Sequence, residues 1–128
     1  MKRVLIVEDQ ADIRKLIRMT LEFENYEIHE ASDGSFGLRM AQAIRPDVLL
    51  LDVMMPGMSG PELLAELRRR ELVVDIPVIL MTAKSMPDEL AALMEHAVTG
   101  IIVKPFDPIS LPSDIAMYWQ LARERRHG

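Results

Sequence analysis

The sequence from residue 47 to residue 60 reads Asp47-Val48-Leu49-Leu50-Leu51-Asp52-Val53-Met54-Met55-Pro56-Gly57-Met58-Ser59-Gly60. Its apolar run ends in the carboxylate of Asp52, and a loop rich in proline and glycine follows. A continuous apolar run between turn residues is typical of a strand buried on both faces, as in a parallel sheet covered by helices. Asp52 is therefore expected at the carboxyl end of that strand, where open α/β sheets hold their ligands.

Apolar runs alternate with helical periodicity on both sides of this strand. We expect further strands over residues 4–7, 26–31, 77–81 and 101–103, and helices from about residue 10, before Pro46, from Pro61, over 87–97 and from about residue 110. In the helix over 87–97, the residues expected to face the core are Leu90, Leu93, Met94 and Ala97. Right-handed crossovers then predict an α/β fold, a doubly wound (βα)5 five-stranded parallel sheet with strand order 2-1-3-4-5.

Composition limits the function classes. At 128 residues the chain is expected to be a single domain, 1–128, with no output domain. The net charge of −5 argues against direct contact with nucleic acid, which needs a basic face. No cysteine is present, and no apolar run is long enough for a membrane span or a signal peptide. We therefore expect a cytoplasmic protein with no membrane insertion. The basic run Arg68-Arg69-Arg70 is interpreted as a solvated helix end.

Polar side chains follow four of the expected strands: Glu8 and Asp9, then Asp52, then Thr82, then Lys104. In a parallel sheet these strand ends meet at one edge, so three carboxylates, a hydroxyl and an ammonium converge there. Clustered carboxylates repel one another unless a cation joins them, and Mg²⁺ prefers such oxygen ligands. A carboxylate beside the ion can act as a nucleophile toward phosphorus, while Thr82 and Lys104 suit the phosphoryl oxygens.

These residues resemble the receiver domain of two-component response regulators. The resemblance covers essentially the whole chain and rests on Val7-Glu8-Asp9, Leu51-Asp52 through Gly60, Met81-Thr82-Ala83 and Val103-Lys104-Pro105-Phe106, in that order and spacing. Each motif is weak alone, but four in register are specific. The resemblance implies a flavodoxin-like receiver fold of the stand-alone, single-domain type.

The resemblance implies a role for each residue at the strand ends. Asp52 is the phosphoacceptor, and Thr82 bonds the phosphoryl oxygen and moves toward it on activation. Lys104 pairs with the phosphoryl group, and the Lys104-Pro105 bond is expected to be cis. The expected Mg²⁺ ligands are Asp9, Glu8 mainly through water, Asp52 and the backbone carbonyl of Met54.

Three positions bear on readout and lifetime. Many receivers carry a Tyr or Phe three residues before the lysine at the end of the last strand, and rotation of its ring is coupled to the movement of the residue at the position of Thr82. In this chain Ile101 stands in place of that aromatic residue. We therefore expect a modified readout. The resemblance implies that the side chains at the positions of Met54 and Lys84 flank the phosphoryl group and tune its lifetime, and we expect these two to slow the entry of water. Ala97-Val98 stand where Gly-Ala is common before the last strand.

The implied function is a phosphoacceptor switch, which catalyses only its own phosphorylation and dephosphorylation and is not a turnover enzyme. Implied partners are a sensor histidine kinase or histidine phosphotransfer protein and a downstream protein target. A homodimer through the helix over 87–97, the strand over 101–103 and the last helix is a further option.

The alternative functions are a pseudo-receiver used for interaction or dimerisation, an aspartate-nucleophile phosphatase and a flavodoxin-type flavin domain. Met54, two residues after Asp52, argues against the phosphatase, which carries an acid there, and Glu8-Asp9 would repel a flavin phosphate.

Overall fold

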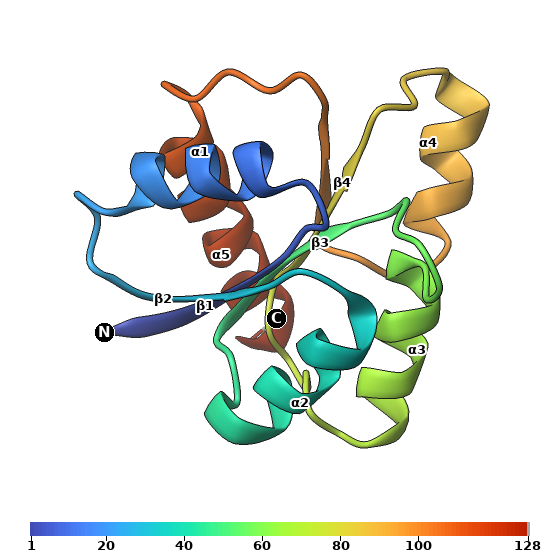
Figure 1. Ribbon diagram of the computed structural model, residues 1–128, viewed down its shortest axis with the longest axis horizontal. Coiled ribbons are helices and arrows are strands. Elements are labelled where there is room, and N and C mark those ends of the chain that lie inside the picture. Colours follow the sequence, from blue (N-terminus) through green and yellow to red (C-terminus); the bar gives the residue numbers. More distant parts are fainter. Residues whose placement is uncertain (128) are drawn as a thin grey trace.

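A five-stranded parallel sheet in the order β2-β1-β3-β4-β5 forms the centre of the computed structural model, which describes the backbone of residues 1–127 and the side chains of residues 1–125. The strands are β1 (Lys2–Val7), β2 (Tyr26–Ala31), β3 (Val48–Asp52), β4 (Val78–Thr82) and β5 (Gly100–Val103). The helices are α1 (Ala11–Leu21), α2 (Gly34–Ile44), α3 (Gly60–Arg69), α4 (Pro87–Met94) and α5 (Leu111–His127). Figure 1 shows α1 and α5 on one face of the sheet and α2, α3 and α4 on the other. The predicted doubly wound α/β fold is confirmed.

The central strand β3 is buried along its whole length, as its apolar run predicts. Alternate side chains enter two cores: Leu49 and Leu51 pack toward α2 and α3, while Val48 and Leu50 pack toward α1 and α5. Burying a side chain of this size contributes roughly 1.5–3 kcal/mol relative to leaving it exposed. The strand is therefore fixed from both faces, and Asp52 at its end is fixed with it.

The helix boundaries follow local signals in the sequence. Asp33 caps α2 by accepting a hydrogen bond from the Phe36 N–H at 2.7 Å. Ser59 and Glu62 form a capping box at the start of α3. The Gly60 N–H, at the start of the same helix, donates to the Val53 carbonyl at 2.9 Å and holds the loop against the strand end.

Helix α4 differs from the sequence prediction. None of its residues is buried; Leu90 and Leu93 are half-buried, whereas Met94 and the following Ala97 are exposed. The helix also ends at Met94, three residues before the expected boundary at Ala97. The periodicity identified the side that faces the protein only for Leu90 and Leu93, because α4 lies at the rim of the sheet and little of the protein covers it.

The turn after α4 is held from a different element. The Arg68 guanidinium on α3 donates to the His96 carbonyl and, at 2.8 Å, to the Ala97 carbonyl. All three arginines of the basic run are exposed, as the interpretation of a solvated helix end expects, and Arg69 and Arg70 pair with Glu66 on the surface. Partial desolvation lowers the pKa of the Arg68 guanidinium.

Helix α5 packs against the edge strand β5 through an aromatic ring. The Tyr118 ring lies against Gly100, where an added Cβ would stand 2.1 Å from a ring carbon, and its hydroxyl donates to the Ile101 carbonyl at 3.3 Å. Glycine is thus required there by contact rather than by backbone angle. None of the helices in residues 1–127 combines the length and apolar character that crossing a membrane requires.

Candidate functional site

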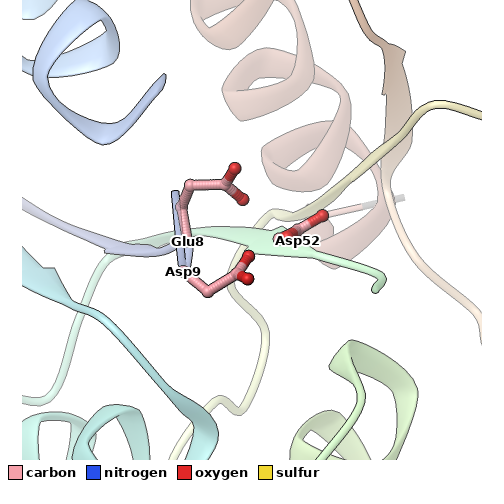
Figure 2. Close-up of side chains that lie close together, drawn as sticks. All are labelled: Glu8, Asp9 and Asp52. Carbon is pink, nitrogen blue, oxygen red and sulfur yellow. The ribbon is translucent and has the colours of Figure 1, made fainter. Parts of the chain in front are cut away.

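Glu8, Asp9, Asp52 and Lys104 meet at the carboxyl edge of the sheet. Figure 2 shows Glu8 and Asp9, from the end of β1, close to Asp52 at the end of β3. The Lys104 Nζ atom, just past β5, donates to Glu8 Oε1 at 2.8 Å and to Asp52 Oδ1 at 3.1 Å. Glu8 is fully buried and Asp52 is 3% exposed, so this pairing is shielded from water. The predicted convergence of these charges is what the structure contains.

The charges alter one another's protonation. Burial, together with the neighbouring Asp52, raises the pKa of Glu8 to about 7 although Lys104 opposes the shift. Burial and Asp52 also raise the pKa of Asp9. Burial alone would lower the pKa of Lys104, but Glu8 and Asp52 outweigh it and raise that pKa. One ammonium does not compensate three carboxylates, so the site attracts positive charge.

The donor set fits a hard divalent cation. Carboxylate oxygens of Glu8, Asp9 and Asp52 all lie within 4.8 Å of one another. Among the described side chains, Glu8 Oε2 is a buried oxygen with no hydrogen-bond partner. An ion with oxygen ligands and retained waters would satisfy that oxygen and relieve the repulsion that raises the pKa of Glu8. These three residues are therefore the ones that could hold Mg²⁺.

Thr82 lies at the same edge, at the end of β4. It is 1% exposed, and its Oγ1 accepts a hydrogen bond from the Lys84 N–H at 3.0 Å. A pocket of about 220 Å³ opens beside it over Asp52, and its lining residues are Asp9, Gln10, Asp52, Met54, Ala83 and Lys104. Asp52 is nearly buried whereas Met54 is 65% exposed, so Asp52 lies at the floor of the pocket and Met54 at its rim.

Two of the residues singled out by sequence stand apart from the pocket. Lys84 does not line it, and its Nζ lies 3.7 Å from a carboxylate oxygen of Glu89. Ile101 is half-buried in the core cluster that contains α2 and α3 residues. Met54 lines the pocket as expected, and the Lys104-Pro105 bond is cis as expected.

Of the three histidines, His29 pairs with Glu27 at 2.8 Å on the surface, His96 is exposed and the side chain of His127 lies outside the described residues.

Sequence reasoning passed over Gln10 and Ala83. Both line the pocket, and both directly follow a residue that it singled out, Asp9 and Thr82. That adjacency was the available signal, because the first loop residues after parallel strands surround whatever the strand ends bind.

An apolar groove adjoins the pocket. It has a volume of about 330 Å³ and is lined by Ile13, Leu16, Pro105 and Phe106, with Gln10, Ala83 and Lys104 shared between the groove and the pocket. The shared residues form the wall between the two hollows. A molecule seated in the groove would therefore lie directly beside the mouth above Asp52.

Comparison with known proteins gives a consistent family. The model of the response regulator receiver domain matches residues 4–116. The chain is 43% identical over 110 residues to the phosphate regulon transcriptional regulatory protein PhoB of Pseudomonas aeruginosa, covering 86% of this chain and 48% of that protein. It is 39% identical over 106 residues to the transcriptional regulatory protein ResD of Bacillus subtilis, covering 83% and 43%. The chain thus spans about half the length of these curated relatives.

Solved structures agree on the fold. The chemotaxis response regulator CheY4 of Vibrio cholerae superimposes with a TM-score of 0.86 at 33% identity, covering 92% of this chain and 98% of that one. The receiver domain of a LuxO repressor protein from Vibrio parahaemolyticus superimposes with the same TM-score of 0.86 at 24% identity, covering 98% and 95%, which supports the fold alone.

Proposed function

The chain belongs to the response regulator receiver domain family, and from that premise we propose that it is the phosphoacceptor switch of a two-component or phosphorelay system. Asp52 would take a phosphoryl group from a sensor histidine kinase or a histidine phosphotransfer protein. The observation that carries the proposal is the pairing of Lys104 Nζ with both Glu8 and Asp52 at the floor of an open pocket. A carboxylate with a fixed counter-charge at the base of an accessible hollow suits attack on phosphorus.

In the transfer, a carboxylate oxygen of Asp52 attacks the phosphorus of the donor. The new oxygen–phosphorus bond forms as the phosphorus–nitrogen bond to the donor histidine breaks, and the electron pair of that bond stays on the imidazole. The Lys104 ammonium is placed to stabilise the negative charge on the phosphoryl oxygens. Thr82, now bonded to the Lys84 N–H, would supply its hydroxyl to another phosphoryl oxygen.

Mg²⁺ would be held by Asp9, by Glu8 mainly through water, by Asp52 and by the backbone carbonyl of Met54. When bound, it would supply positive charge that neutralises the phosphoryl oxygens. The buried Glu8 oxygen without a partner and the raised pKa of Glu8 both support a cation there. The residues of this chain would then orient Asp52 and keep water away from its buried side.

Output would start at Thr82. Movement of its hydroxyl toward the phosphoryl group would break the bond to the Lys84 N–H and pull on the loop before α4. Because Ile101 replaces the aromatic partner of this motion, we expect the readout to pass mainly through that loop and α4. The face built by α4, β5 and α5 would bind a downstream protein, or a second copy of the chain as a homodimer.

The cellular setting belongs to the same proposal. We place the domain in the cytoplasm, as a signalling switch rather than a turnover enzyme. The relatives named as transcriptional regulators are longer than this chain, and with a net charge of −5 we expect this domain itself not to contact nucleic acid. Lifetime tuning by Met54 remains part of the proposal, and the place of Lys84 outside the pocket reduces its expected share.

The test is intact-mass spectrometry after incubation with acetyl phosphate and Mg²⁺. The parent protein should gain one phosphoryl group, and Asp52→Asn, which keeps the shape of the side chain but not its nucleophilic carboxylate, should gain none. Asp9→Asn keeps the nucleophile and weakens the ion site, so it should gain the group more slowly. Equal labelling of the parent and Asp52→Asn would show that another residue is modified and would overturn the proposal.

A further inference from the structure

We infer that Gln10 positions the water that hydrolyses the phosphorylated Asp52, so that its carboxamide shortens the lifetime of the active state. This inference rests on the proposed function, because it concerns the second half of the same phosphoryl cycle. Gln10 would act on the water and not on the protein's own phosphoacceptor, so it is a positioning residue for hydrolysis.

The shape of the pocket decides where water enters. Asp52 is 3% exposed at the floor, so a phosphoryl group on it would point toward the open side. Attack on phosphorus is in line with the bond that breaks, and a water molecule must therefore approach from the mouth. The exposed residues that line the pocket, Gln10, Met54 and Ala83, form that mouth.

Of these three side chains, the carboxamide is the one suited to hold water. It offers a carbonyl oxygen that accepts two hydrogen bonds and an amide group that donates two, whereas a thioether is a weak acceptor and a methyl group is neither donor nor acceptor. The other polar residues that line the pocket already have partners. Asp9 belongs to the carboxylate cluster with Glu8 and Asp52, and Lys104 donates hydrogen bonds to the same two residues. Lys84 lies outside the pocket and pairs with Glu89.

Gln10 is also held at its backbone and available at its side chain. It is the residue before α1, and its carbonyl accepts the first helical bond from the Arg14 N–H at 3.0 Å. Its side chain does not cap the helix, and among the described side chains no hydrogen bond is found for its carboxamide. The residues most common at this position are Ser, Thr, Asp and Asn, whose side-chain oxygens accept hydrogen bonds from the first N–H groups of the helix. Here the position is fixed while both functional groups stay available to a ligand.

The hydrolytic step is balanced by water alone. The water oxygen forms a bond to phosphorus as the bond between phosphorus and the Asp52 oxygen breaks, and its electron pair returns to the carboxylate. Both protons of the water end on the released phosphate. The Gln10 carbonyl accepts a hydrogen bond from the water and orients its lone pair toward phosphorus, without taking the proton.

Decay of the phosphorylated protein tests this inference. Gln10→Met keeps the length of the side chain and removes both polar groups, and Gln10→Ala removes the side chain. We expect both to slow decay by about threefold to tenfold, the rate equivalent of one hydrogen bond. The protein is phosphorylated with acetyl phosphate, the donor is removed, and the phosphorylated fraction is followed by intact mass. The ratio of the decay rate to the phosphorylation rate should fall, which a general structural loss would not produce.

Met54→Ala is the matched control, since it trims another residue of the same mouth without removing a carboxamide. It should speed decay by giving water a wider entry. If Gln10→Ala speeds decay as well, Gln10 is a steric shield and the inference is overturned. Unchanged decay in both Gln10 variants overturns it too. A parent protein that takes no phosphoryl group would instead overturn the proposed function, and this inference with it.

Discussion

The Lys104 Nζ atom lies 3.1 Å from the Asp52 Oδ1 atom, so the end of β5 is tied to the end of β3 across the intervening strand β4. The same ammonium donates to Glu8, which follows β1, so one cation joins the ends of β1, β3 and β5. Because the cluster holds more negative charge than positive, this contact stabilises the fold before any chemistry takes place. Its removal should therefore affect stability as well as phosphorylation.

Lys104→Met should destabilise the ion-free protein by about 2 kcal/mol at pH 8, since it leaves buried carboxylates without a counter-charge. The side chain of Lys104 is 14% exposed, so the loss should be smaller than for a fully buried pair. Urea denaturation in EDTA measures it. Lys84→Met removes an ammonium from a pair more than a third exposed and should change stability by less than about 0.5 kcal/mol. Similar losses in both variants would contradict this prediction.

The ion-free protein should lose stability as the pH rises from about 4.5 to about 7. The folded state raises the pKa of Glu8 from 4.5 to about 7, so between these values the folded protein holds a proton that the unfolded chain has released. Folding is then favoured at the lower pH, by an upper limit of about 3 kcal/mol. The raised pKa of Asp9 acts in the same direction at lower pH.

Mg²⁺ should reverse this trend, because it binds the deprotonated carboxylates and its stabilising effect grows with pH. Melting temperatures at pH 5, 6, 7 and 8, in EDTA and in Mg²⁺, check both halves. Glu8→Gln cannot titrate and should flatten the curve in EDTA. A melting temperature in EDTA that rises from pH 5 to pH 7 would contradict the assigned direction.

Gly60→Ala should reduce both stability and phosphorylation. A Cβ on Gly60 would stand 2.3 Å from the backbone carbonyl oxygen of Asp52, so the strand end that carries the phosphoacceptor would have to shift. We expect a loss of about 2–3 kcal/mol and slower labelling by acetyl phosphate. Gly57→Ala is the control: its φ is +79°, but a Cβ there meets nothing within 4 Å. It should cost about 1 kcal/mol and leave the labelling rate close to that of the parent.

Ala97→Gly should stabilise the protein by roughly 0.5–1 kcal/mol. Ala97 has a φ of +56°, in the left-handed region that a side chain disfavours, in the turn between α4 and β5. Thermal or urea denaturation measures the change. Ala92→Gly, inside α4 where helical angles suit alanine, should destabilise instead. Loss of stability in both variants would show that the flexibility of glycine in the unfolded chain outweighs the relieved strain.

Binding of a phosphoryl mimic should change the loop from Thr82 to Lys84 more than it changes Ile101. The Thr82 hydroxyl has a bond to exchange, with the Lys84 N–H, whereas Ile101 has no ring to rotate. Amide chemical shifts with and without the mimic compare the two places. Thr82→Ala should weaken the loop response. A large inward shift at Ile101 would show that the missing aromatic ring does not alter the readout.

Much of the architecture could be predicted from the sequence. The apolar run from Val48 to Leu51 predicted a strand covered on both faces, and parallel strands that end in polar residues place those residues at one edge. The Lys104 contacts with Glu8 and Asp52 follow from that topology, since parallel strands end on the same side. Periodicity and strand order therefore sufficed for the charged floor of the pocket.

The rim and the surface could not be predicted in the same way. Hydrophobic spacing on α4 shows which residues share a side, but not whether another element covers that side, and so Met94 was wrongly assigned to the core. Arg68 reaches carbonyls 28 and 29 residues away, a contact that no local pattern encodes. Gln10 lacks a recognisable chemical signature of its own and became notable only beside the pocket that it lines.

Helix α4 joins the protein through two half-buried leucines, and the turn behind it is held by the Arg68 guanidinium. With so little hidden surface, its docked and displaced positions should differ by only a small free energy. A partner that prefers one position tenfold shifts the balance by about 1.4 kcal/mol. A modest difference in a partner's affinity can therefore change the fraction of molecules in which α4 is displaced. The free-energy cost of transmitting the signal lies in α4 rather than in the sheet.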